Sequence, residues 1–234
     1  MNLIESMSAE VASVSPKAIL LPVGSLEQHG TEAPLGCDGI IAEQICLLAG
    51  NLTGCAVLPC LYYGRSDPHR AFPGTFSLSE KTYSSLLAEI IEESQRNGFR
   101  KIIILSGHGG NRSPAETAIQ STGSSSYAEY LGYWQLSGTT DEEERLFGPT
   151  GHHITTSEVS MVWHILNRNV PGVFSGKYPS APDNLASMSP DQFKMHFPRG
   201  GVGGDMSKVS VDKGAILLGF IANALVKRIK NDKT

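Results

Sequence analysis

Three side chains of the kind that bind divalent metals lie close together early in the chain. Glu27, His29 and Asp38 fall within the segment LPVGSLEQHGTEAPLGCD, residues 21–38. On an extended backbone, residues i and i+2 point to the same side, so Glu27 and His29 could bind one metal cluster. Zn, Mn and Fe accept imidazole nitrogen and carboxylate oxygen. Asp38 could join them from the start of the next helix, although an aspartate there could equally be a helix N-cap.

A histidine in a glycine-rich loop supplies a further candidate ligand. His108 lies in SGHGGN, residues 106–111, directly after an apolar run. Gly107, Gly109 and Gly110 would let the backbone turn tightly and approach a ligand closely. The same loop could instead hold an anion on its N–H groups, although it lacks the Lys-Ser/Thr pair of a P-loop.

Two adjacent histidines and a glutamate form the last candidate cluster. His152 and His153 should point to different sides, so at most one of them faces a given centre. A neutral histidine beside a metal is suited to shuttle a proton near pH 7. Glu158 could belong to such a centre, or it could complete a helix capping box that begins at Thr155.

Alternating strand and helix patterns must position these side chains. Short apolar runs predict strands at residues 17–23, 55–61, 100–107 and 127–136. Helical spacing predicts helices at residues 38–50, from about 80 to 97, from about 113, and at 156–167 and 211–229. The expected start and end signals of these helices are Asp38, Gly50, Ser77 with Glu80, and Ser113 followed by Pro114.

This alternation indicates a single α/β domain over residues 1–234, with a mostly parallel central sheet. Ligand sites in such folds lie beyond the carboxyl ends of the strands. The loops that carry Glu27 and His108 both follow predicted strands, so we expect them to meet at one edge. Residues 170–209 are rich in Pro, Gly and Ser and are expected to be irregular; within them, GGVGGD (200–205) is expected to be a mobile loop over the site.

Composition narrows the class of protein. The net charge of the 234 residues is −4, without a basic or acidic block, which argues against nucleic acid or an anionic membrane as a partner. The apolar run AILLGFIANALV, residues 215–226, is shorter than the roughly 18 residues needed to span a bilayer. The first residues lack the pattern of a secretory signal, and no C-x-x-C pair occurs. We therefore expect a cytoplasmic protein with free thiols.

Five segments, in order along the chain, resemble motifs of the creatininase (creatinine amidohydrolase) family. They are LPVGSLEQHG followed by PLGCD, then YGRSDPHRAFPGTFSL, LSGHGGN, HHITTSEVSM and GVGGDMSKVSVDKG. The resemblance implies a three-layer α/β/α sandwich and a metal-dependent hydrolase. Its substrate would be a small molecule, and its target a carbon–nitrogen bond other than an ordinary peptide bond, as in a cyclic amide or a formamide. It also implies a homo-oligomer, with a hexamer as one form; an exposed apolar face on residues 215–226 would be compatible with this.

The same resemblance implies roles for single residues. The expected metal ligands are Glu27, His29, Asp38 and His108, with Asp38 bridging two ions of Zn, Mn or Fe. His153 matches the family's catalytic histidine, and Glu158 the glutamate that follows it. Creatininase has a ligand glutamate where this chain has Gly110, so either one ion is bound or Glu158 completes a second site. Creatininase also has two substrate-facing tryptophans; Trp134 matches one, and the other falls near Pro149, where no aromatic residue stands, so the resemblance leaves open whether creatinine is a substrate.

These assignments give one mechanistic hypothesis and one rival. In the first, a metal-activated water attacks the amide, His153 protonates the departing nitrogen, and the N–H groups of Gly109 and Gly110 steady the oxyanion. His69 and Trp134 would shape the substrate pocket. In the rival hypothesis, the protein is a non-enzymatic small-molecule or nucleotide-binding protein whose Gly-rich loops are anion-binding sites. Metal content separates the two.

Overall fold

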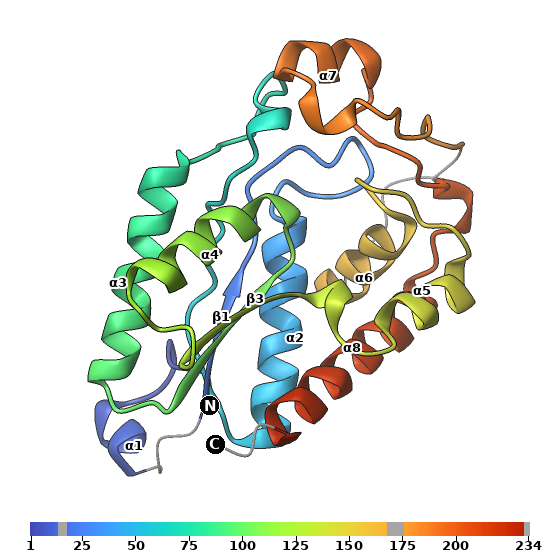
Figure 1. Ribbon diagram of the computed structural model, residues 1–234. Helices are drawn as coiled ribbons and strands as arrows, with labels where there is room; N and C mark the ends of the chain where they lie inside the picture. Colours follow the sequence, from blue (N-terminus) through green and yellow to red (C-terminus); the bar gives the residue numbers. More distant parts are fainter. Residues whose placement is uncertain (14–17, 168–175, 232–234) are drawn as a thin grey trace.

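A parallel sheet of four strands organises the part of the chain that the computed structural model describes, residues 1–13, 18–167 and 176–231 (Figure 1). The strand order is β2-β1-β3-β4. The strands are β1 (Ala18–Val23), β2 (Ala56–Val57), β3 (Lys101–Ser106) and β4 (Ala128–Gly132). All three strand pairs are parallel, as the sequence predicts.

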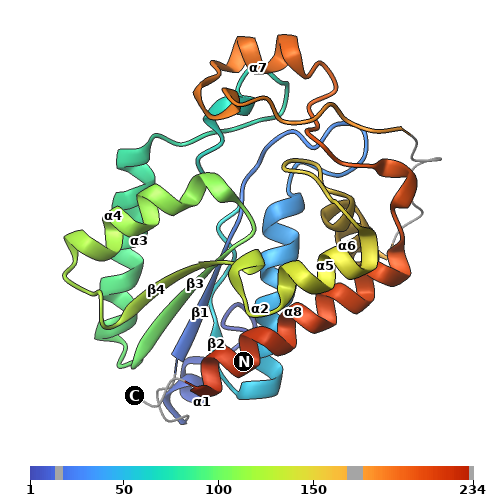
Figure 2. The same ribbon diagram turned by 45° about the vertical axis from the view of Figure 1, so that its right-hand side comes forward.

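Helices cover both faces of the sheet, which gives the expected three-layer α/β/α sandwich (Figure 2). The helices are α1 (Ser8–Ser13), α2 (Cys37–Thr53), α3 (Glu80–Arg96), α4 (Arg112–Ser121), α5 (Thr139–Phe147), α6 (Thr156–Leu166), α7 (Pro190–His196) and α8 (Val211–Asn231). Alternate residues of β3 face opposite layers: Ile102 and Ile104 pack with α3 and α4, whereas Ile103 and Leu105 pack with α2, α6 and α8. This explains why the strand is apolar throughout.

The strand register brings three carboxyl ends together. Val23 of β1 pairs with Ser106 of β3, which pairs in turn with Gly132 of β4. The loops after these strands therefore leave the sheet at one edge, where the predicted site residues begin. Short 3-10 turns η1 (Asp67–His69), η2 (Gly109–Asn111) and η3 (Tyr133–Gln135) add to this edge.

Helix α2 begins and ends differently from the prediction. Its N-cap is Gly36, without a side-chain cap, and Asp38 lies inside the first turn. The prediction of Asp38 as an N-cap is therefore wrong, and its carboxylate is left for other contacts. The helix runs past Gly50 to Gly54, whose φ of 76° gives the left-handed C-cap.

The caps of α3 and α4 were also placed wrongly. Ser79, not Ser77, caps α3 by accepting a hydrogen bond from Thr82 N at 3.2 Å. Helix α4 begins one residue before Ser113, whose hydroxyl donates to Glu80 Oε1 at 2.7 Å instead of capping. Side chains that resemble helix caps in the sequence can instead form hydrogen bonds with residues distant in the chain, as Ser113 does with Glu80.

Helix α8 is mainly a core helix. It packs against α6 and α2, and Leu217, Ile221 and Leu225 are fully buried. Ile216 is exposed, but most of the other large apolar side chains of the 215–226 run are buried. The apolar face expected to be exposed on this run is therefore mostly covered by the chain itself. Within the described residues, no helix has the length and apolarity required to cross a membrane.

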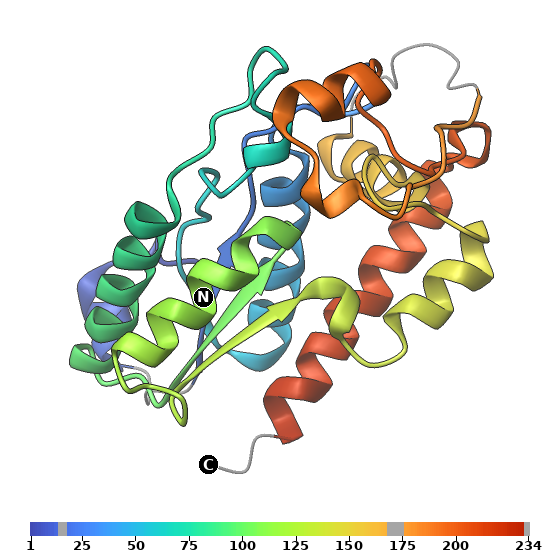
Figure 3. The ribbon, with the colours of Figure 1, turned by 45° about the horizontal axis from the view of Figure 1, so that its top comes forward.

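Three α-helices are not expected from the sequence: α1, α5 and α7. Helix α7 lies within the stretch 170–209, of which residues 170–175 fall outside the described chain. Helix α7 begins with a capping box between Ser189 and Gln192 and packs beside η1 at the edge that carries the site (Figure 3). The irregular stretch thus contains an ordered cover over that edge.

Candidate metal centre and substrate pocket

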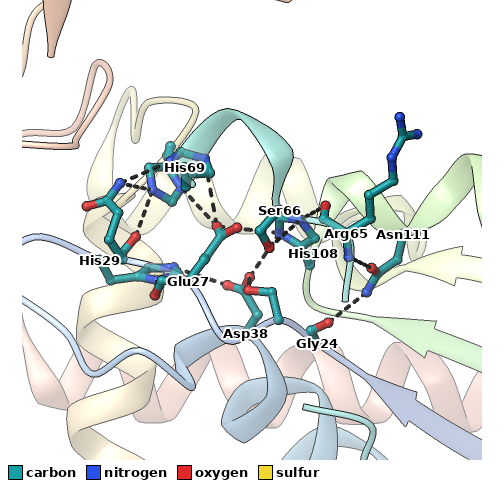
Figure 4. Close-up of polar contacts among 12 residues, drawn as sticks. Gly24, Glu27, His29, Asp38, Arg65, Ser66, His69, His108 and Asn111 are labelled. Atoms are coloured by element: carbon teal, nitrogen blue, oxygen red, sulfur yellow. Dashed lines mark hydrogen bonds and ion pairs between the residues drawn. The ribbon is translucent and has the colours of Figure 1, made fainter. Parts of the chain in front are cut away.

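Four predicted ligands come together above the carboxyl edge of the sheet (Figure 4). His29 Nε2 lies 3.1 Å from Asp38 Oδ1, and His108 Nδ1 lies 3.0 Å from Asp38 Oδ2. His108 Nδ1 is also 3.5 Å from Glu27 Oε1. Asp38 thus stands between two imidazoles, with one carboxylate oxygen toward each.

The donor set fits a divalent metal. In the described part of the chain, Glu27 Oε2 is buried without a hydrogen-bond partner, and His29 Nε2 has only its ionic contact with Asp38. Such orphaned buried atoms are costly unless a cation satisfies them. Among residues 1–13, 18–167 and 176–231, three groups have ligand atoms within 4.8 Å of one another: Glu27 with Asp38 and His108, Glu27 with His69 and His153, and His29 with Cys37 and Asp38.

Electrostatics at the centre favour a positive charge between the carboxylates. Burial would lower the pKa of His29, but Asp38 and Glu27 outweigh it and raise that pKa to about 10. Burial likewise opposes the charge on His108, yet Glu27 and Asp38 raise its pKa to about 9. Burial would raise the pKa of Asp38, but the two imidazoles hold it well below its usual range. Either protons on the imidazoles or a metal ion can provide this charge.

Contacts behind the ligands fix their orientation. Ser25 Oγ donates to Asp38 Oδ2 at 2.7 Å. His108 Nε2 is 2.9 Å from the carbonyl oxygen of Arg65, and His29 Nδ1 is 3.2 Å from that of Glu27. A backbone carbonyl on one ring nitrogen turns the other nitrogen toward the metal position. Ser25 was missed from the sequence, although its place between β1 and Glu27 was a signal.

His153 approaches from the segment before α6. Its Nδ1 lies 3.5 Å from Glu27 Oε1, and its ring centroid is 4.1 Å from that of His69. Burial and the neighbouring histidines hold the pKa of His153 well below its usual value, so the ring is neutral near pH 7. His152 is exposed; it also lines the cavity, but none of the potential metal groups among the described residues contains it.

Glu158 lines the same cavity, but its carboxylate is hydrogen-bonded to the first turn of α6. Its Oε2 accepts from Thr155 N at 2.8 Å, and Thr155 Oγ1 accepts from Glu158 N at 3.1 Å, which is the expected capping box. Burial and the charge of Asp38 raise its pKa to about 7. None of the three potential metal groups found among the described residues contains Glu158.

The predicted substrate residues line one cavity of about 470 Å³ together with the centre. They are His69, Gly109, Gly110 and Trp134. A Cβ at Gly110 would lie 2.1 Å from Arg65 O and 2.6 Å from His108 Nε2, so the backbone there leaves no room for a side chain. A Cβ at Gly109 would meet nothing within 4 Å. The cavity also includes Glu143 of α5, which sequence reasoning missed because α5 was not foreseen.

The GGVGGD loop closes one side of the cavity. His152 N donates to Val202 O at 2.8 Å, and Val202 N donates to His153 O at 2.9 Å. Gln28, which was also missed, connects this loop with the histidines: its Nε2 is 3.2 Å from Gly200 O and 2.9 Å from His153 Nε2. The loop therefore lies over the site as expected, and its mobility stays a prediction.

Sequence comparisons match parts of the chain to parts of three curated proteins. A creatinine amidohydrolase of Pseudomonas putida is 34% identical over 95 residues, 38% of this chain and 36% of that protein. A mycofactocin precursor peptide peptidase of Mycolicibacterium smegmatis is 34% identical over 120 residues, 49% of this chain and 48% of that protein. A 3-dehydro-scyllo-inosose hydrolase of Thermotoga maritima is 36% identical over 92 residues, 39% of this chain and 30% of that protein. The matches thus span less than half the length of these curated relatives.

Solved structures and a family model each match nearly the whole chain. A creatininase structure described as the Mn form superposes with a TM-score of 0.85 at 22% identity, over 99% of this chain and 98% of that one. A mutant creatininase of Zn-Zn type gives a TM-score of 0.84 at 22% identity, over 99% and 97%. The family model for creatininase, described as creatinine amidohydrolase, matches residues 5–229. The chain belongs to the creatininase family.

Proposed function

We propose that this protein is a metal-dependent hydrolase that cleaves a C–N bond in a small amide, such as a cyclic amide or a formamide. The observation that carries the proposal is the cluster of Glu27, His29, Asp38 and His108, with orphaned ligand atoms on Glu27 and His29. All of these residues except His29 line the cavity. A divalent ion held by these four residues would polarise an amide carbonyl and make water acidic enough to attack near neutral pH. The geometry of Asp38, with an imidazole at each oxygen, would also let it bridge two ions.

The surroundings of His153 support its role in proton transfer. Its Nε2 is 3.1 Å from the backbone oxygen of Gln28, which can only accept, and 2.9 Å from the side-chain amide nitrogen of Gln28, which can only donate. Partners are therefore available at Nε2 for both neutral tautomers. The other ring nitrogen, Nδ1, lies 3.5 Å from Glu27 Oε1 and faces the candidate metal centre. A neutral His153 can therefore take a proton from the attacking water and deliver it to the departing nitrogen.

Other pocket residues would bind or orient the substrate. The N–H groups of Gly109 and Gly110 would steady the developing oxyanion. Trp134 and His69 would shape the space around the substrate. Glu158, with a pKa near 7, could exchange a proton with His153 or the product, and it could complete a second metal site. The rival anion-binding hypothesis is less well supported, because four carboxyl side chains line the cavity: Glu27, Asp38, Glu143 and Glu158.

Two substitutions test the assignments, with a matched control. His108→Ala should lower bound Zn, Mn or Fe by elemental analysis and abolish hydrolysis. His153→Ala should keep its metal and lose about 10²–10⁴-fold in turnover. His164→Ala, at an exposed position of α6 that does not line the cavity, is the control and should retain both properties. Full metal content in His108→Ala would disprove its assignment as a ligand, and a near-normal rate in His153→Ala would disprove its role in proton transfer.

The substrate screen should follow the chemistry of the family. Cyclic amides, imides, lactones and formamides are tested with the metal-reconstituted enzyme, and short peptides form a separate arm because one relative is a peptide peptidase. Nucleotide binding by a metal-free protein that hydrolyses none of these would favour the rival hypothesis.

We also propose a cytoplasmic homo-oligomer. The four cysteines, Cys37, Cys46, Cys55 and Cys60, are free thiols, which suits a reducing compartment. The proposed oligomer is a hexamer, and light scattering after size-exclusion chromatography measures its mass. A monomer would disprove the assembly without affecting the site.

A further inference from the structure

The cavity contains one carboxylate that the proposed chemistry does not use. Glu143 projects from α5 into the space shared with Glu27, Asp38 and Glu158. Its Oε1 accepts a hydrogen bond from Ser157 Oγ. Among the described residues, no lysine, arginine or histidine forms an ion pair with it. A carboxylate that faces a cavity without a basic partner can bind a cation that enters it.

Glu143 is held in place by a line of hydroxyl groups. Ser157 Oγ, which is buried, lies 3.0 Å from Thr155 Oγ1. Thr155 Oγ1 accepts from Glu158 N in the capping box, so its own proton is free to go to Ser157, and the Ser157 proton goes to Glu143. The carboxylate is thus oriented from α6, the helix whose first turn carries Glu158. Such support is typical of a side chain that positions a ligand.

The charge balance of the cavity leaves Glu143 uncompensated. Glu27 and Asp38 already face imidazoles and would face the metal. Arg65 is the single arginine or lysine among the lining residues the structure describes, and it is engaged elsewhere: its Nε is 3.0 Å from Asp67 Oδ2 and its Nη1 is 2.8 Å from Glu80 Oε2. A substrate with a negative end would therefore meet repulsion near Glu143 without a free basic group to offset it.

An aromatic side chain lines the same cavity, on the 3-10 turn η3 that contacts α5. Trp134 of η3 precedes α5 by a few residues, lines the same cavity and is only partly buried. Aromatic faces attract ammonium and guanidinium groups, and a carboxylate adds directional hydrogen bonds to the same groups. Trp134 and Glu143 together supply both kinds of recognition.

We propose that Glu143, with Trp134, forms a subsite for a positively charged, N–H-donating end of the substrate, such as an ammonium, amidinium or guanidinium group. The amide bond to be cleaved would lie at the cluster of Glu27, Asp38 and His153. This inference rests on the proposed function for the identity of the substrate, but the subsite can be tested by binding alone.

The test uses two probes of the same shape and different charge. Benzamidine is a planar cation, and benzamide is its neutral counterpart. Calorimetry with the metal-containing protein should show benzamidine binding at least about tenfold more tightly than benzamide, as expected for a charge-assisted hydrogen bond. Glu143→Gln should remove most of this difference. Glu144→Gln, the same change at an exposed position of the same helix, should keep it.

Each result decides the proposal. Equal affinities of the two probes for the wild-type protein would overturn it, and so would an unchanged preference in Glu143→Gln. If Glu143→Gln does not fold, Glu143→Asp is measured instead. It keeps the negative charge on a side chain one methylene shorter, so it should lower the affinity for benzamidine and leave that for benzamide unchanged. An unchanged benzamidine affinity would then refute the subsite. Metal content and turnover are measured separately, so a failure of the hydrolase proposal is distinguishable from a failure of the subsite.

Discussion

Substitution of Gly110 by alanine tests the packing that supports the metal centre. A Cβ at this position would lie 2.1 Å from Arg65 O and 2.6 Å from His108 Nε2. Those two atoms are themselves joined by the 2.9 Å contact that orients the His108 ring. The added methyl group would therefore have to separate them, because both lie well inside contact distance.

The losses of stability and of metal affinity in Gly110→Ala can be estimated from two effects of this clash. Overpacking of a well-packed region costs about 1–3 kcal/mol, and the loss of a contact that orients a ligand typically weakens metal binding about 10–100-fold. Gly110→Ala should therefore lower the melting temperature by about 2–4 °C for each kcal/mol lost. The metal dissociation constant, measured by competition with a chelator, should rise about 10–100-fold.

Gly109→Ala is the matched control, because a Cβ there would meet nothing within 4 Å in the same 3-10 turn. Its stability and metal affinity should stay close to those of the wild type. If Gly110→Ala binds metal as tightly as Gly109→Ala, the contact between His108 and the Arg65 carbonyl does not support the ligand, and the explanation for glycine at this position fails.

Two further changes test the support of the ligands and the packing of α8. Ser25→Ala removes the 2.7 Å hydrogen bond to Asp38 and should weaken metal binding about 10–100-fold in the same chelator competition; an unchanged affinity would contradict the orienting role of Ser25. Gly214→Ala would place a Cβ 2.3 Å from Ser160 O and should destabilise the fold by about 1–3 kcal/mol in denaturant unfolding. Gly219→Ala, in open space on the same helix, should instead stabilise it by up to about 1 kcal/mol, and shifts of equal sign would count against the packing argument.

The features that local pattern determines could be predicted from the sequence. The apolar run of β3 predicts a buried strand, and the glycines after it predict a tight turn at the sheet edge. The strand register brings His108 beside Glu27, whereas Glu27 and His29 fall in different potential metal groups that share Asp38. The meeting of the loops could be predicted because a parallel sheet places the ends of its strands together whatever the details of the helices. The assignment of these side chains as metal ligands stays a prediction.

Features that depend on distant partners could not be predicted in this way. Asp38 looks like an N-cap, but His29, His108 and Ser25 engage its carboxylate. Ser113 likewise looks like a cap, but its hydroxyl donates to Glu80 of α3. A polar residue at a helix start has several possible partners, and only the tertiary fold decides among them.

Glu143 and Gly110 show why the site could be only partly inferred. Glu143 lies in no recognisable motif. Its carboxylate is oriented by hydrogen-bonded hydroxyl groups of Thr155 and Ser157 at the start of α6. Gly110 could be recognised as the position of a missing ligand, but its sequence position gives no reason for the glycine. The structure supplies one: the volume that a side chain would need is filled by the contact between His108 and the Arg65 carbonyl.

The same observation bears on how many ions the centre could hold. Because no side chain fits at position 110, a second ion would depend on His29, on Oδ1 of Asp38 and on one further donor nearby. Cys37 has a ligand atom within 4.8 Å of those of His29 and Asp38, whereas Glu158 is engaged in its capping box. Burial raises the pKa of the Cys37 thiol, so a metal there would have to displace a tightly held proton. An ion held by Glu27, His108 and Oδ2 of Asp38 would have to displace the imidazole proton of His108, whose pKa is about 9, but no thiol proton, and we therefore expect it to bind first.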